Sequence, residues 1–135
     1  MISAFSSLFP LTQKLISLPA KRPLRLTLPA LMEQIAFTMK LKPGVEAEYK
    51  RRHDEIWPEL SQILTEAGIR DYSIYLEPAS GTLFAVQKRM PGHTADYLPT
   101  LAIMKKWWAY MADLMETNPD NSPVVNNLEL VFHAE

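Results

Sequence analysis

The sequence predicts an α+β fold of the ferredoxin-like split βαβ type, with elements in the order β-α-β-β-α-β. Four short segments alternate apolar and polar residues, as strands with one buried face do. Two longer segments repeat apolar residues at three- and four-residue steps, as amphipathic helices do. Clusters of Pro and Gly separate these segments. In such a fold an antiparallel sheet carries both helices on one face.

The first predicted strand covers residues 33–41, in which every second residue from Ile35 onward is apolar. A helix is predicted from about Val45, and Gly68 is a typical C-terminal stop for it. Pro58 lies inside this helical pattern, and proline lacks the N–H that an inner helical turn needs. We therefore expect a kink or break near Trp57.

A β-hairpin is predicted next, from strands at residues 71–77 and 82–89 around the turn cluster at 78–81. In the first of these strands Tyr72 shares a face with two apolar residues, whereas Tyr75 faces the opposite way.

The second helix is predicted at about residues 100–115, where an apolar stripe recurs at helical spacing. A stiff polar loop is expected at 118–123, followed by a last strand through 128–132. The sheet face opposite the helices also carries apolar residues in most strands. Because one layer of helices covers only one face, we expect a homodimer built sheet to sheet, of the dimeric α/β barrel type.

Residues 1–31 differ from the remainder, because they hold four basic residues, no acid and four of the 11 prolines. We interpret residues 1–31 as an N-terminal extension that is disordered or not part of the native protein, with Met32 as the functional start. A targeting segment and an interaction arm are the alternatives. The folded domain is expected at residues 32–135.

Composition excludes several classes of function. The chain has 135 residues, a formal net charge of −1 and no cysteine. A nucleic-acid-binding surface, which needs clustered basic residues, and a metal site with thiolate ligands are therefore not expected. The three histidines lack metal-ligand spacing, no phosphate-binding or dinucleotide motif occurs, and no apolar run reaches membrane-spanning length. We predict neither a cofactor nor a metal site, and neither a nucleic-acid nor a membrane partner.

Two clusters carry candidate chemistry. Tyr49 and His53 lie four residues apart, so they share a helix face that borders the apolar stripe. A histidine there can exchange a proton near neutral pH, and the alternative is a packed imidazole bonded to a nearby carbonyl. Arg51 and Arg52 are interpreted as a solvated, salt-bridged surface, with anion binding as the alternative.

The second cluster is the pair Trp107 and Trp108, followed by Tyr110. Adjacent helical residues point about 100° apart, so one tryptophan can pack in the core while the other lines a cavity. Aromatic rings with polar edges suit the apolar face and the hydroxyls of a sugar, and ordinary core packing is the alternative. Tyr72 adds a further phenol. This set suits proton transfer on a neutral polar ligand.

Four motifs occur in order within residues 32–132: Glu48-Tyr49-x-Arg51-Arg52-His53-x-x-Ile56-Trp57-Pro58-Glu59-Leu60, Tyr72-Ser73-Ile74-Tyr75-Leu76, Trp107-Trp108-x-Tyr110-Met111 and Asn118-Pro119-Asp120-Asn121-Ser122-Pro123. They resemble the motifs of the L-rhamnose mutarotase family. The resemblance implies a small, cytoplasmic, cofactor-free homodimeric isomerase that interconverts the α and β anomers of L-rhamnose.

By the same resemblance, His53 is the proton donor, Tyr49 and Tyr72 bind the sugar, and Trp107 and Trp108 are the family's paired tryptophans. Two other classes of function remain as alternatives. A cofactor-independent monooxygenase of the same fold would consume oxygen, and a non-catalytic sugar-binding protein would bind without accelerating anomer exchange.

Overall fold

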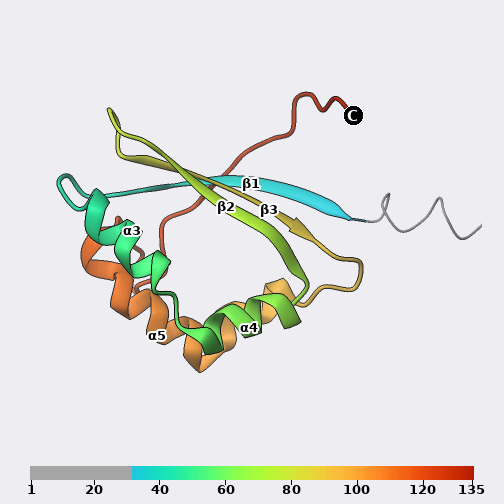
Figure 1. The fold of residues 1–135 in the computed structure, drawn as a ribbon, viewed down its shortest axis with the longest axis horizontal. Helices are drawn as coiled ribbons and strands as arrows, with labels where there is room; N and C mark the ends of the chain where they lie inside the picture. The colour runs from blue at the N-terminus through green and yellow to red at the C-terminus, as the bar shows by residue number, and fades with distance from the viewer. Residues whose placement is uncertain (1–31) are drawn as a thin grey trace, which may run out of the picture. The chain divides into compact units, whose positions relative to one another are not determined.

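The computed structural model describes residues 32–135, so the extension expected at 1–31 lies outside the described residues. Four strands form one antiparallel sheet in the order β2-β3-β1-β4, which confirms the predicted ferredoxin-like arrangement. The helices α3, α4 and α5 lie on one face of this sheet (Figure 1). The elements, in chain order, are β1 (Glu33–Lys40), α3 (Glu46–Asp54), α4 (Pro58–Glu66), β2 (Ile69–Glu77), β3 (Thr82–Arg89), the 3₁₀ helix η2 (Ala95–Thr100), α5 (Ala102–Met111), the 3₁₀ helix η3 (Ala112–Leu114) and β4 (Asn126–Asn127).

The predicted first helix is broken where the sequence indicated. Trp57 has extended backbone angles, φ −60° and ψ 129°, and Pro58 is the first residue of α4. A residue before proline is driven out of the helical region, whereas proline itself is favourable at the first helical position. Gly68 follows α4 with a φ of +91°, as expected of a glycine stop.

The core lies between the sheet and the helices. Opposite residues on neighbouring strands align in rows on the helix-covered face, such as Met39 with Leu83 and Leu83 with Leu76. Leu60 of α4 and Leu83 of β3 are the largest side chains that are essentially inaccessible. This row and the helices above it also surround the cavity described below.

The structure corrects two element predictions. The second helix is shorter than expected, because α5 covers only Ala102–Met111 and the chain continues as the 3₁₀ helix η3 over Ala112–Leu114. A separate 3₁₀ helix, Ala95–Thr100, precedes it, and Pro99 within that segment lacks the N–H that would let α5 begin earlier.

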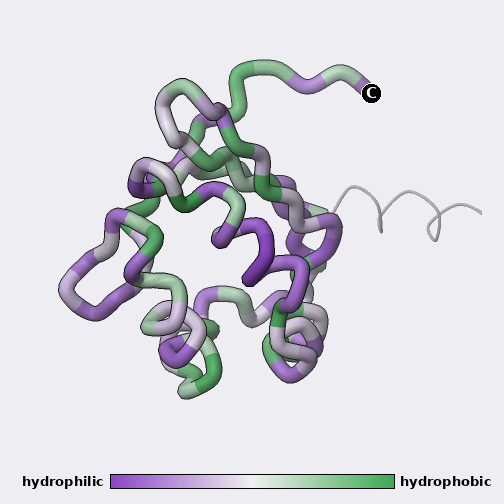
Figure 2. Tube along the Cα trace, turned by 60° about the vertical axis from the view of Figure 1, so that its left-hand side comes forward, coloured by the Kyte–Doolittle hydropathy of each residue, from purple (hydrophilic) through white to green (hydrophobic). Residues whose placement is uncertain are grey.

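The strand predicted at residues 128–132 is wrong, because β4 contains only Asn126–Asn127. After Leu128 the chain leaves β1, and residues 130–132 are 75% to 92% exposed. This apolar C-terminal segment runs past the sheet on the side away from the helices (Figures 1 and 2). Alternation alone does not form a strand, since a strand also needs a paired neighbour and a surface to bury its apolar face.

Candidate active site

Helix α3 places Tyr49 and His53 one turn apart on the same face, as their spacing predicts. Their ring centroids are 4.3 Å apart. Tyr49 is buried and His53 is half-buried. The imidazole also contacts Trp107 of α5, with 5.4 Å between ring centroids and an angle of 86° between the ring planes. One imidazole therefore lies between an aromatic residue of its own helix and one from the neighbouring helix.

The hydrogen bond of His53 determines which ring nitrogen carries the proton. Nδ1 lies 3.2 Å from the carbonyl oxygen of Tyr49. Because a carbonyl only accepts, a neutral imidazole must donate from Nδ1 and keep its lone pair on Nε2. Within residues 32–135, every side-chain nitrogen or oxygen that is shielded from solvent has a hydrogen-bond partner. Nε2 of His53 has no hydrogen-bond partner among these residues, so it is not shielded from solvent and is accessible to a ligand.

Burial also keeps this imidazole neutral. Desolvation lowers the pKa of His53 below its usual value of 6.5, while the bond to the Tyr49 carbonyl and the charge of Asp54 act in the opposite direction. At neutral pH the side chain is therefore mainly an uncharged imidazole with a free lone pair. Such a group accepts a proton first and donates it afterwards.

Two phenols lie near the imidazole and are hydrogen-bond donors rather than bases. Burial raises the pKa of Tyr49 well above its ordinary range, and the nearby Tyr72 adds to the shift. Burial of the Tyr72 hydroxyl raises its pKa to about 12, against a smaller opposing effect of Arg89. Tyr72 as a whole residue is 39% exposed, so the raised pKa reflects the packed surroundings of the hydroxyl.

The paired tryptophans take different positions on α5. Trp107 is buried and contacts the Trp57 ring edge-on, with 5.1 Å between centroids, whereas Trp108 is half-buried. Their burial differs as the 100° separation predicts, but both line the cavity described below rather than one alone. Trp57 and Tyr110 belong to the same aromatic cluster, with 5.5 Å between their ring centroids.

One cavity of about 830 Å³ brings the five predicted residues together. It lies between the sheet and helices α3 to α5, and its volume falls in the range of small-molecule sites. Apolar side chains from β1, β2, β3 and α5 form much of its wall. The polar and aromatic residues that line it are Glu46, Tyr49, Lys50, His53, Asp54, Tyr72, Trp107 and Trp108.

Sequence reasoning missed the charged part of this cavity wall. Lys50 and Asp54 form an exposed ion pair with an N–O distance of 2.7 Å. Their four-residue spacing on α3 predicts this pair, but only the position of the cavity shows that the pair lies at a site.

Within residues 32–135 no three His, Asp or Glu side chains form a metal-binding group. None of the helices in this range has the length and apolar composition of a membrane span.

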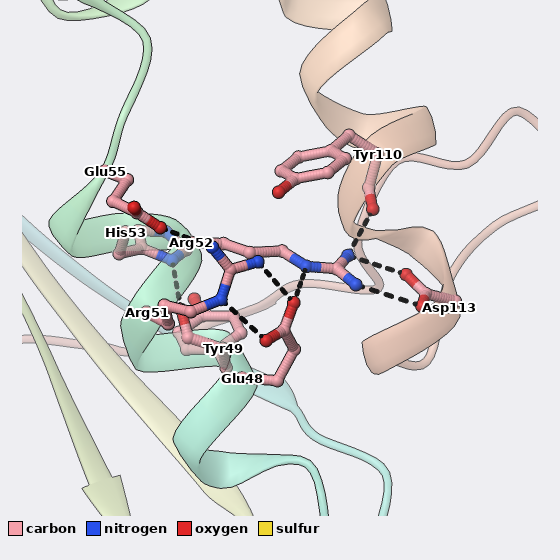
Figure 3. Close-up of polar contacts among 8 residues, drawn as sticks. All are labelled: Glu48, Tyr49, Arg51, Arg52, His53, Glu55, Tyr110 and Asp113. Carbon is pink, nitrogen blue, oxygen red and sulfur yellow. Dashed lines mark hydrogen bonds and ion pairs between the residues drawn. The ribbon is translucent and has the colours of Figure 1, made fainter.

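The two arginines beside His53 differ from each other, contrary to the prediction that both are solvated. Arg51 is 53% exposed and hydrogen-bonds Glu48 and Glu55. The Arg52 side chain is only 12% exposed and reaches Asp113 of η3, with Nη1 2.8 Å from Oδ1 (Figure 3). Together the two guanidinium groups hold the pKa of Glu48 at about 2.

Comparisons with known proteins identify the family of this chain. The family model described as L-rhamnose mutarotase matches residues 34–134. An L-rhamnose mutarotase of Acidiphilium cryptum is 60% identical over 102 residues, which cover 76% of this chain and 98% of that protein. One of Brucella anthropi is 59% identical over 101 residues, which cover 75% and 95%. The crystal structure of an L-rhamnose mutarotase from Formosa agariphila superposes with a TM-score of 0.71 at 48% identity, covering 76% of this chain and 99% of that one. The chain belongs to the L-rhamnose mutarotase family.

Proposed function

We propose that this protein is an isomerase that interconverts the α and β anomers of L-rhamnopyranose in rhamnose metabolism. Family membership over residues 34–134 supports the reaction. The observation that carries the chemistry is the accessible Nε2 of a neutral His53 in the wall of a cavity of sugar-binding size. No energy source or cofactor is needed, because the two anomers differ little in free energy.

The His53 tautomer supports a single-residue proton shuttle. Nε2 takes the proton from the anomeric hydroxyl, O1, as the bond between C1 and the ring oxygen O5 breaks. The C1–O1 bond becomes the aldehyde carbonyl, and O5 takes the proton from the imidazolium. Rotation about the C1–C2 bond presents the other carbonyl face, and the reverse steps close the ring. One proton moves from O1 to O5 and back, and His53 is the proton donor to the ring oxygen.

The surroundings of His53 support this sequence of steps. The Tyr49 carbonyl accepts from Nδ1 in both protonation states, so it fixes the ring and stabilises the imidazolium that forms. General acid–base assistance of this kind contributes about 10²–10⁴-fold in rate. The cavity wall excludes bulk water from part of the imidazole, which strengthens the electrostatic contribution.

The aromatic residues support recognition of a 6-deoxy sugar. Tyr49 and Tyr72 stay protonated at neutral pH because their pKa values are raised, so each can donate to a sugar hydroxyl. Trp107 and Trp108 offer apolar ring surface to the side of the sugar that carries the methyl group. A hexose with a hydroxyl in place of that methyl would bury an unpaired polar group there.

A homodimer is part of the same proposal. On the sheet face opposite the helices, Phe84 and Tyr75 are opposite each other in register and are 39% and 65% exposed. The C-terminal segment adds Leu130, Val131 and Phe132, all strongly exposed in the single chain. Burying both surfaces against a second copy would remove an apolar area that isolated proteins rarely expose. The family resemblance also supports a cytoplasmic location.

NMR saturation transfer between the α and β anomeric protons of L-rhamnose tests the function. We expect the protein to accelerate exchange far above buffer, and L-fucose to exchange more slowly. No acceleration for L-rhamnose would contradict the proposal. Thermal stabilisation by L-rhamnose without faster exchange would instead identify a sugar-binding protein.

A further inference from the structure

Helix α3 carries Tyr49 and His53, yet little backbone packing holds it in place. It makes few close backbone approaches to any other element. The cavity lies directly beneath it and takes the space that core side chains would fill. The helix is nine residues long and has no side-chain cap at its first residue. The position of α3 must therefore depend on individual side-chain contacts with neighbouring elements.

Arg52 makes several of these contacts. Its Nη1 donates to the carbonyl oxygen of Tyr110 at 2.6 Å and to Oδ1 of Asp113 at 2.8 Å, and its Nη2 lies 3.3 Å from Oδ2 of Asp113. The guanidinium also lies over the Tyr110 ring, 4.5 Å from its centroid. Nε donates to Glu48 at 2.7 Å, which fixes the arginine on its own helix (Figure 3). These bonds tie α3 to the end of α5 and to η3.

The geometry of this tie bears on the active site. Arg52 is adjacent to His53 in the sequence, and its partner Tyr110 is one turn from Trp107 on α5. His53 and Trp107 contact each other between the same two elements. Among the described residues that line the cavity, neither Arg52 nor Asp113 is present. An effect of Arg52 on the site would therefore run through the placement of α3 and not through direct contact with a ligand in the cavity.

We propose that Arg52 is a positioning residue, whose bonds to Asp113 and the Tyr110 carbonyl hold His53 against Trp107 in the geometry needed for proton transfer. The inference rests on the proposed function of His53. Planar, forked guanidinium bonds restrict both distance and orientation, which a lysine ammonium cannot reproduce. Displacing a reacting group by about 1 Å costs on the order of 100-fold in rate.

The test uses three variants, Arg52→Lys, Asp113→Asn and their double variant. Arg51→Gln is the control, because it removes a positive charge one residue away and the hydrogen bonds that it removes go to Glu48 and Glu55, on or next to its own helix. Anomer exchange is measured against L-rhamnose concentration, well below the melting temperature of each variant. Asp113 is 65% exposed, so Asp113→Asn keeps the test usable if Arg52→Lys does not fold.

We expect kcat to fall about 10- to 100-fold in each single variant, with KM changed about threefold at most. The kcat of the double variant should be no lower than that of the slower single variant, because both substitutions break the same contact between Arg52 and Asp113. Arg51→Gln should stay close to the unmodified protein. A folded Arg52→Lys or Asp113→Asn with kcat within about twofold of the unmodified protein would overturn the proposal.

A second measurement separates this inference from the proposed function. The His53 Hε1 resonance reports its position relative to the rings around it, and it can be assigned by its loss in His53→Asn. We expect Asp113→Asn, but not Arg51→Gln, to shift it. An unmodified protein without exchange activity would contradict the mutarotase proposal, and an unshifted resonance would contradict the positioning role.

Discussion

Replacing Gly68 with alanine should destabilise the fold through two separate costs. Gly68 joins α4 to β2, the strand that carries Tyr72. Its φ of +91° lies in the left-handed region that residues with a Cβ rarely adopt. A Cβ at this position would also lie 2.9 Å from Cβ and 3.2 Å from Cα of His93. Ordinary contacts between carbon atoms are about 3.5–4.0 Å.

The magnitude follows from how firmly His93 is held. Met90 N–H donates to the Gly68 carbonyl at 2.8 Å, and Thr94 N–H donates to the Ala67 carbonyl at 2.9 Å. His93 cannot move away from a Cβ at position 68 without stretching these two hydrogen bonds. The left-handed conformation costs alanine about 1–2 kcal/mol. Overpacking of this kind adds about 1–3 kcal/mol, for a total of about 2–5 kcal/mol.

Gly92→Ala is the matched control, because Gly92 has a φ of +74° and nothing within 4 Å of an added Cβ. It should lose only the conformational part, about 1–2 kcal/mol. Urea unfolding followed by circular dichroism gives both free energies of unfolding. A Gly68→Ala variant within about 0.5 kcal/mol of Gly92→Ala would refute the close-contact argument, since the overpacking it predicts is larger.

Three further predictions concern the site and the core. The pKa of His53 is lowered and its neutral form accepts the proton, so the exchange rate should be constant near neutral pH and should decrease in acid, with a midpoint below pH 6.5. A rate that increases in acid would contradict this. Tyr49→Phe should raise KM about 3- to 10-fold in the same exchange assay, because one hydrogen bond to the sugar is lost. An unchanged KM would contradict this role of Tyr49. Leu60→Ala, at a residue that is 1% exposed, should lower the free energy of unfolding by about 2–5 kcal/mol in urea, and a loss below about 1 kcal/mol would be inconsistent with its burial.

Local signals in the sequence predict most of the fold. Proline at position 58 constrains both itself and Trp57, so the break between α3 and α4 follows from two residues. The four-residue spacing of Tyr49 and His53 likewise determines their shared face. The angular separation of Trp107 and Trp108 indicates that their burial differs.

The features that sequence reasoning missed depend on contacts between distant segments. Arg52 and Asp113 are 61 residues apart, so no local pattern distinguishes Arg52 from the solvated Arg51. The same holds for residues 128–132, whose alternation indicates a strand although, within residues 32–135, only the Leu128 N–H bonds to a neighbouring strand, at the Ala36 carbonyl. Local periodicity reports which face of a segment is apolar, and tertiary packing decides what covers that face.

Anomer exchange of L-rhamnose in His53→Asn, compared with the unmodified protein by NMR saturation transfer, tests the role of His53 most directly. The asparagine amide can still donate to the Tyr49 carbonyl, but it cannot take up and return a proton. We expect the folded variant to lose about 10²–10⁴-fold in exchange rate. A folded His53→Asn variant that exchanges the anomers as fast as the unmodified protein would contradict the assignment of proton transfer to His53.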